Sequence, residues 1–94
     1  MFTLSYTNRF LKDLKLIKKR SQKDFNLLNV FINQLSLTGV KGLEKKNFAH
    51  KLKGEYNDCW ECHVKPDLLL LWIEITSENE IRLIRTGSHS DLFK

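Results

Sequence analysis

The apolar run Leu68-Leu69-Leu70-Leu71-Trp72-Ile73 limits most strongly how this 94-residue chain can fold. The run has the length of a strand and falls short of the about 18 apolar residues that a membrane-spanning helix needs. A strand without polar alternation is typical of one that is buried on both faces. We therefore predict that Leu68–Ile75 is the central strand of a sheet.

Two segments carry apolar residues at helical spacing. One stripe consists of Phe10, Leu14 and Ile17 with support from Leu11, and the other of Leu28, Phe31, Ile32 and Leu35. Side chains that cap helices precede both stripes: Thr7 or Asn8 before the first, Ser21 or Asp24 before the second. The second helix is predicted to end within Ser36–Gly39, because glycine tolerates a left-handed cap.

Alternating apolar residues predict three further strands, at Met1–Thr7, Cys59–Lys65 and Glu80–Arg85. The segment Val40–Asn57 shows no strong period, and we predict an ordered loop there. The order is β-α-α-β-β-β. The predicted fold class is α+β, with two helices packed on a mainly antiparallel four-stranded sheet and residues 1–94 in one domain.

The charge is uneven along the chain. The 16 Lys and Arg residues exceed the 11 Asp and Glu residues, for a formal net charge of +5. Residues 1–50 hold ten basic and three acidic residues (+7), whereas residues 51–94 hold six and eight (−2). A basic half favours a polyanion or an acidic protein as partner. A solvated helix face would give the same composition, so charge alone leaves both interpretations open.

Neither a signal peptide nor a disulfide framework is visible. The first ten residues, MFTLSYTNRF, lack a basic stretch followed by an apolar one, so we expect a cytoplasmic protein. The segment Cys59-Trp60-Glu61-Cys62-His63 matches the haem-attachment spelling. In a strand, however, positions 59 and 62 point to opposite faces, which disfavours haem, zinc and redox roles. We expect no metal or other cofactor.

The residues that can carry chemistry lie in the second half of the chain. The three histidines are His50, His63 and His89, and Asp67 and Arg85 accompany them. Imidazole titrates near neutral pH, as general acid–base catalysis requires. A lone histidine is usually structural, but this set points to a site that a shared sheet surface could assemble.

Two segments resemble the YafQ branch of the RelE/ParE toxin superfamily. They are Glu61-Cys62-His63-Val64-Lys65-Pro66-Asp67, followed by the apolar strand, and the C-terminal stretch Arg85-Thr86-Gly87-Ser88-His89-Ser90-Asp91-Leu92-Phe93. The resemblance covers almost the whole chain. It implies a RelE-like fold and a type II toxin that cuts mRNA in the ribosomal A site. The implied reaction is an attack by the substrate's own 2′-OH, without metal.

The resemblance also implies roles for individual residues. His89 becomes the general acid for the 5′-oxygen, Asp67 and His50 activate the 2′-OH, and His63 assists. Arg85 neutralises charge on the phosphorane. Two kinds of RNA contact complete the expectation: stacking of a base on Phe93, and ribosomal RNA contacts from Lys12, Lys15, Lys18 and Lys19.

The expected partners are an acidic antitoxin, the ribosome and mRNA, with an antitoxin complex that can bind operator DNA. One alternative is a ParE-like toxin that poisons DNA gyrase. Another is an inactive protein of the same fold that acts with the antitoxin as co-repressor. The gyrase toxin does not need the His, Asp and Arg set, and this set therefore favours the ribonuclease.

Overall fold

The computed structural model describes residues 1–56 and 58–93, so Asn57 of the predicted loop and Lys94 lie outside the described residues. Its sheet consists of β1 (Thr3–Tyr6), β2 (His50–Lys51), β3 (Trp60–Lys65), β4 (Leu68–Ile75) and β5 (Glu80–Gly87). The strand order is β1-β5-β4-β3-β2. β1 runs parallel to β5, and the other pairs are antiparallel.

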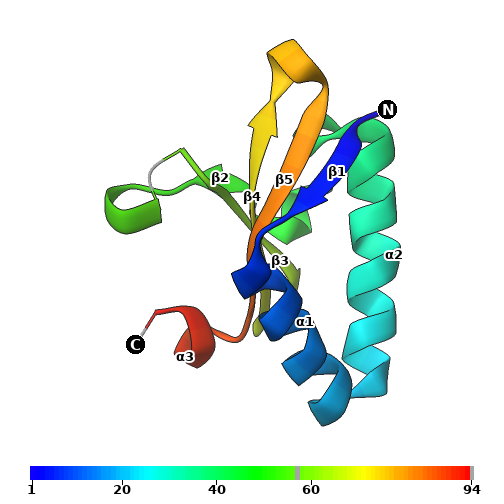
Figure 1. Ribbon diagram of the computed structural model, residues 1–94, viewed down its shortest axis with the longest axis vertical. Helices are drawn as coiled ribbons and strands as arrows, with labels where there is room; N and C mark the ends of the chain where they lie inside the picture. Colours follow the sequence, from blue (N-terminus) through cyan, green and yellow to red (C-terminus); the bar gives the residue numbers. More distant parts are fainter. Residues whose placement is uncertain (57, 94) are drawn as a thin grey trace.

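The two long helices lie together on one side of this sheet (Figure 1). They are α1 (Asn8–Arg20) and α2 (Gln22–Thr38). The Thr7 hydroxyl caps α1 by accepting a hydrogen bond from the Phe10 N–H at 3.0 Å, and the Ser21 hydroxyl caps α2 through the Asp24 N–H at 3.1 Å. Gly39 ends α2 with a φ of 68°. The predicted helices and two of their candidate caps are thus confirmed.

β4 is the central strand, as predicted, and it is buried on both faces. Its residues Leu68, Leu70 and Trp72 belong to the core beneath α1 and α2. Leu69 and Leu71 face the other way and pack with Leu92. Each fully buried leucine contributes about 1.5–3 kcal/mol through the hydrophobic effect. The side chains of this one strand therefore pack in both apolar clusters, one on each face of the sheet.

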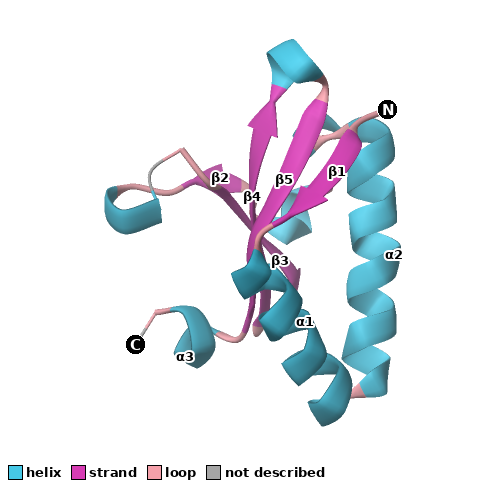
Figure 2. Cartoon of the chain, viewed as in Figure 1, coloured by secondary structure: helices cyan, strands magenta, loops and turns pink. Residues whose placement is uncertain are grey.

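The described structure differs from the prediction in two short elements. Within the predicted loop, His50 and Lys51 pair with Glu61 and Trp60 as β2, which makes the sheet five-stranded rather than four-stranded. Three short 3-10 turns surround β2, and after β5 the chain forms a third helix, α3 (His89–Leu92) (Figure 2). The α+β class and the two-helix layer stand. Among the described residues, no helix is long and apolar enough to cross a membrane.

Candidate active site

The turn after β5 places His89 beside Asp67. Gly87 has a φ of 151°, and a Cβ there would lie 2.9 Å from an Asp91 carboxylate oxygen. This close approach allows Ser88 and Asp91 to cap α3 reciprocally, a capping box. His89 is consequently the first residue of α3. Asp67 lies in the turn between β3 and β4, next to it in space.

His89 and Asp67 form a hydrogen-bonded pair. The Asp67 Oδ1 accepts from the His89 backbone N–H at 3.0 Å and from Nδ1 at 2.7 Å. These two bonds lower the pKa of Asp67, the backbone bond most strongly. Because Nδ1 is the donor, Nε2 is the nitrogen that can meet a substrate. Both side chains are more than half exposed, and RNA can therefore reach them.

The other two histidines gather around Glu61. His63 lies with its ring centroid 5.5 Å from that of His89. The Glu61 Oε1 lies 3.4 Å from His50 Nε2 and 3.9 Å from His63 Nε2, and the Glu61 side chain is buried. β2 and β3 hold these groups in register, because His50 pairs with Glu61. The three predicted histidines and Asp67 thus lie in one continuous cluster.

Glu61 was absent from the predicted site, although the sequence carries a signal for it. Residues two apart on a strand point to the same face, so an alternating strand that presents His63 also presents Glu61. Burial of a carboxylate requires charged or hydrogen-bonding partners, and the rings of His50 and His63 lie beside the Glu61 Oε1.

Arg85 is anchored by a buried ion pair. Its Nε and Nη2 donate to the two carboxylate oxygens of Asp13 at 2.9 and 3.0 Å, and Nη1 donates to the Tyr56 hydroxyl at 3.4 Å. The Arg85 and Asp13 side chains are only 11% and 10% exposed. The hydrogen bonds that Arg85 donates to Asp13 raise the pKa of Arg85. Arg85 therefore also has a structural function, which joins α1 to β5, and its contact with RNA stays a prediction.

A β-bulge lies next to Arg85 in β5. Leu71 pairs with Arg85, but Trp72 pairs with Leu83, and Ile84 is therefore the additional residue. β1 pairs with β5 only as far as Leu83. Beyond that residue, the Asp13 carboxylate accepts a hydrogen bond from the Thr86 N–H of β5 at 3.2 Å. Bulges of this kind commonly redirect a side chain next to an active site.

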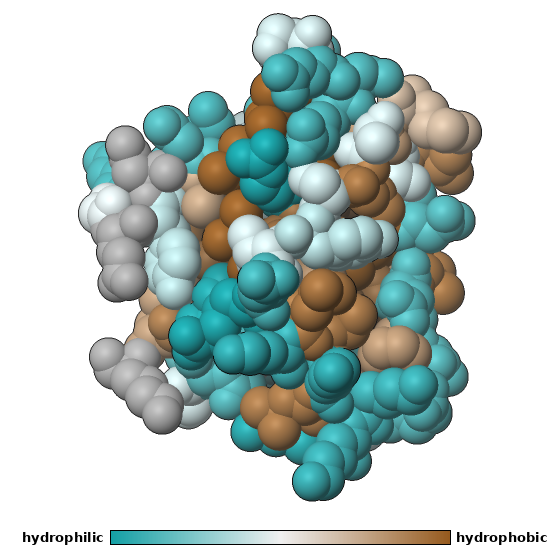
Figure 3. Space-filling view, in the orientation of Figure 1, coloured by the Kyte–Doolittle hydropathy of each residue, from teal (hydrophilic) through white to brown (hydrophobic). Residues whose placement is uncertain are grey.

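Phe93 lies at the end of α3 beside Tyr56, and the four candidate lysines lie on α1. The Phe93 ring meets Tyr56 edge to face, with centroids 6.1 Å apart, and the residue remains 43% exposed. Lys12 lines an open groove of about 460 Å³ between α1 and α3, together with Arg9, Arg20 and Arg85. Lys18 Nζ lies 5.2 Å from the centroid of the Phe25 ring. Lys15 and Lys19 are exposed on α1, where the surface is mostly hydrophilic with apolar patches between (Figure 3).

The two cysteines are buried thiols. Burial raises the pKa of both Cys59 and Cys62, most strongly for Cys62 in the core beneath the helices. A high pKa keeps the thiol protonated and therefore weak as a nucleophile or ligand. Within residues 1–56 and 58–93, no three His, Cys, Asp or Glu side chains are placed to hold a metal ion.

The carboxylates that hold α3 should make it sensitive to acid. Hydrogen bonding lowers the pKa of Asp67 through His89 and that of Asp91 through the Ser88 backbone, with Arg20 also contributing. A carboxyl with a lowered folded pKa stabilises above its unfolded value of about 3.9 and loses this effect as pH falls through the folded pKa. We expect protection factors of the Ser88 and His89 amides to hold between about pH 5 and 8 and to fall below about pH 4. Hydrogen exchange measures this, and equal protection at both ends of the range would contradict it.

Comparison with known proteins places the chain in a family. Residues 2–94 match the model of the family described as bacterial toxin of type II toxin-antitoxin system, YafQ. The mRNA interferase toxin YafQ of Escherichia coli K12 is 32% identical over 90 residues, which cover 96% of this chain and 94% of that protein. Among solved structures, a metal-bound toxin from Helicobacter pylori has a TM-score of 0.84 at 41% identity, with 99% of this chain and 100% of that one covered.

The E. coli DinJ-YafQ complex offers a second structural match, with a TM-score of 0.83, 30% identity and 100% of both chains covered. The similarity therefore extends from β1 to α3 and does not depend on one motif. The resemblance predicted from Glu61–Asp67 and Arg85–Phe93 is confirmed: this chain belongs to the YafQ family of bacterial toxins of type II toxin–antitoxin systems.

Proposed function

We propose that this toxin is an mRNA interferase, a ribosome-dependent endoribonuclease that works without a metal ion in the chemical step. The observation that carries the proposal is the hydrogen bond between His89 Nδ1 and Asp67, which orients the imidazole and leaves Nε2 for a substrate. A carboxylate that orients a histidine is a recurring arrangement in acid–base catalysis. The relative from E. coli named an mRNA interferase supports the substrate class.

The proposed reaction begins with attack of the substrate's 2′-oxygen on the adjacent phosphorus. The new bond closes a 2′,3′-cyclic phosphate as the bond from phosphorus to the 5′-oxygen breaks. His89 gives a proton to the departing 5′-oxygen. The carboxylate of Asp67 and the imidazole of His50 are the proposed acceptors of the 2′-OH proton. His63 supports this geometry, and no external water or metal enters the step.

Two further groups are proposed to bind the RNA. Arg85, held by Asp13, neutralises part of the charge that develops on the phosphorane. Phe93, partly exposed beside Tyr56, stacks on a base. The inhibitory partner is proposed to be an acidic antitoxin, in line with the solved DinJ-YafQ complex of a relative. We also propose operator DNA as a target of that complex and the cytoplasm as its location.

Ribosome dependence follows from the small size of the binding surface. In-line attack needs an extended RNA backbone. Correct alignment of the reacting groups can lower a reaction barrier by about 7–11 kcal/mol. A programmed ribosome can present one codon at a fixed place while the lysines of α1 contact ribosomal RNA phosphates. We expect cuts at codon-fixed positions in translated mRNA and little cleavage of the same mRNA without ribosomes. Equal rates on both substrates would contradict the proposal.

The lysine contribution can be separated from overall charge. The variant K12Q/K15Q/K19Q is compared with K23Q/K41Q/K53Q, which loses the same charge at exposed positions elsewhere. Only the first variant should weaken ribosome association and reduce its salt dependence. The same loss in both would assign the effect to net charge. Gyrase-linked DNA damage without RNA cleavage would favour the ParE-like alternative.

A further inference from the structure

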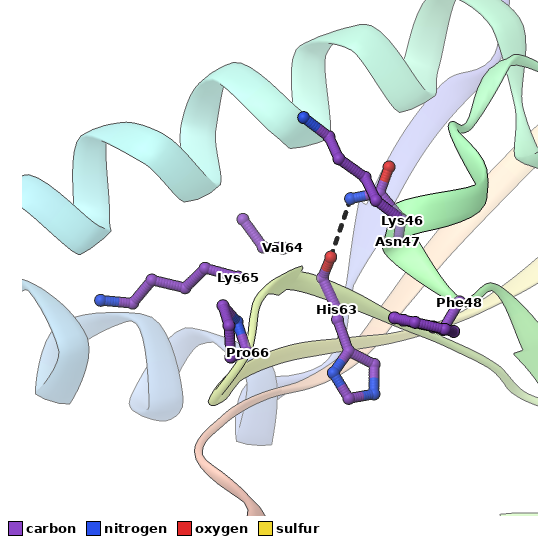
Figure 4. Close-up of a pocket in the computed structure, with 7 residues that line it drawn as sticks. All are labelled: Lys46, Asn47, Phe48, His63, Val64, Lys65 and Pro66. Atoms are coloured by element: carbon purple, nitrogen blue, oxygen red, sulfur yellow. Dashed lines mark hydrogen bonds between the residues drawn. The ribbon is translucent and has the colours of Figure 1, made fainter.

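A pocket beside His63 has no role in the reaction described above. It has a volume of about 580 Å³ and includes Phe48 and His63 among its walls (Figure 4). β2 pairs with β3 only at Trp60 and Glu61, so the pocket lies along the part of β3 that β2 does not cover. Ligand pockets typically measure about 300–1,000 Å³. This pocket is therefore large enough for a nucleotide, and His63 connects it to the candidate active site.

Phe48 offers an aromatic surface to this pocket. The residue is 66% exposed and lies outside both clusters of packed apolar residues. Its ring meets His63 edge to face, with centroids 5.7 Å apart and planes at 69°. An exposed phenylalanine with no part in the core leaves its face available to a ligand.

The backbone holds Phe48 in an unusual conformation. Its φ is 50°, in the left-handed region that bulky residues rarely adopt. Two hydrogen bonds fix the segment. The Asn47 amide donates to the His63 carbonyl at 2.8 Å (Figure 4). His50 Nδ1 donates to the Phe48 carbonyl at 2.7 Å. Persistent strain of this type concentrates at ligand sites and active sites. The segment that carries Phe48 is thus bound to two of the candidate catalytic histidines.

The charges around the pocket favour a polyanion. Lys46 and Lys65 both line it. Lys46 lies 3.6 Å from the exposed Glu44, and Lys65 lies 2.7 Å from Asp24. Solvent-exposed ion pairs contribute little free energy, so both ammonium groups can turn toward phosphates. An aromatic side chain and cations that line the same pocket are the composition that binds single-stranded nucleic acid.

We propose that this pocket is a nucleobase subsite, in which Phe48 stacks on one base of the mRNA next to the scissile phosphate. Lys46 and Lys65 hold the neighbouring phosphates. The proposal rests on the endoribonuclease function and adds a group that positions one flanking nucleotide. Stacking accepts any base, so the subsite controls the position of the strand rather than its sequence.

The test uses a short mRNA that binds but is not cut, because a 2′-deoxynucleotide at the scissile position removes the attacking hydroxyl. 2-Aminopurine replaces each neighbouring base in turn, and its fluorescence is measured with the RNA free and on programmed ribosomes. Wild type should change the fluorescence at one position. F48A should lose this change and bind about tenfold more weakly, whereas F48W should retain both. The matched control is L37A, because Leu37 is 50% exposed on α2 outside the pocket.

Cleavage of unmodified mRNA gives a second readout. F48A should cut about tenfold more slowly at low toxin concentration and leave the same product ends. An abasic nucleotide at the stacked position should slow wild type but not F48A. If wild type changes the fluorescence of the labelled RNA but does not cleave unmodified mRNA, the subsite is supported and the proposed reaction is contradicted. An unchanged signal in F48A, or no signal at any position, overturns the subsite. Normal cleavage by F48A with weakened antitoxin binding overturns it in favour of the antitoxin.

Discussion

Replacement of His89 by alanine is expected to lower the rate of mRNA cleavage about 10²–10⁴-fold, the usual contribution of a positioned proton donor. The fold should remain intact, because the His89 side chain is 54% exposed. Its backbone N–H, which survives the substitution, still donates to Asp67. Single-turnover cleavage on programmed ribosomes measures the rate, and the affinity for the antitoxin measures the integrity of the surface.

The matched control is S90A, the neighbouring position in α3, which should cleave as wild type does. D67N keeps the size of its side chain but loses the charge that orients His89 and the carboxylate that is proposed to accept the 2′-OH proton. Because His50 is the second proposed acceptor, we expect a smaller loss of rate than for H89A. Wild-type cleavage by H89A would show that the proton donor has been assigned to the wrong residue.

Replacement of Asp13 by alanine is expected to lower the free energy of unfolding by about 3–5 kcal/mol, the usual cost of breaking a buried ion pair. The Arg85 guanidinium would remain buried without its carboxylate, and the Thr86 N–H would lose its acceptor. Urea unfolding followed by circular dichroism measures the change. D24A removes the more exposed pair with Lys65 and should cost about 0–1 kcal/mol.

The double variant D13L/R85M separates the two roles of Arg85. Because it replaces both partners by apolar side chains, it should recover most of the stability lost in D13A. If Arg85 also acts on the phosphorane, the double variant will cleave mRNA more slowly than wild type although it is stable. Recovery of both stability and cleavage would make Arg85 purely structural, and a loss below about 1 kcal/mol in D13A would contradict the buried-pair interpretation.

The elements that follow local periodicity were predictable from sequence. Leu68–Ile73 is continuously apolar, and its first five residues are buried in the sheet. The helices α1 and α2 begin after the side chains that cap them, Thr7 and Ser21. β2 was not predictable, because His50 and Lys51 are both exposed and show no alternation. α3 spans four residues, too few for a periodic signal, although Ser88 and Asp91 have the spacing of a capping box.

The candidate site was likewise predictable only in part. Position-by-position resemblance selected His50, His63, Asp67 and His89, and the structure gathers them. The partners that fix them come from long-range pairing: Asp13 and Arg85 are 72 residues apart. Asp13 follows Phe10 by three residues and precedes Ile17 by four. A charged residue on the buried stripe of α1 therefore indicated a buried partner for its carboxylate. The identity of that partner required the fold.

The two ends that the toxin leaves on cleaved mRNA test the proposed chemistry most directly. Attack by the 2′-OH, with proton transfer by His89, produces a 2′,3′-cyclic phosphate on the upstream fragment and a 5′-OH on the downstream fragment. Mass spectrometry of fragments from a purified translation system distinguishes these ends, with the H89A protein as the background control. The proposal predicts the cyclic phosphate and the 5′-OH. A 3′-OH with a 5′-phosphate would instead indicate hydrolysis by an activated water and would contradict it.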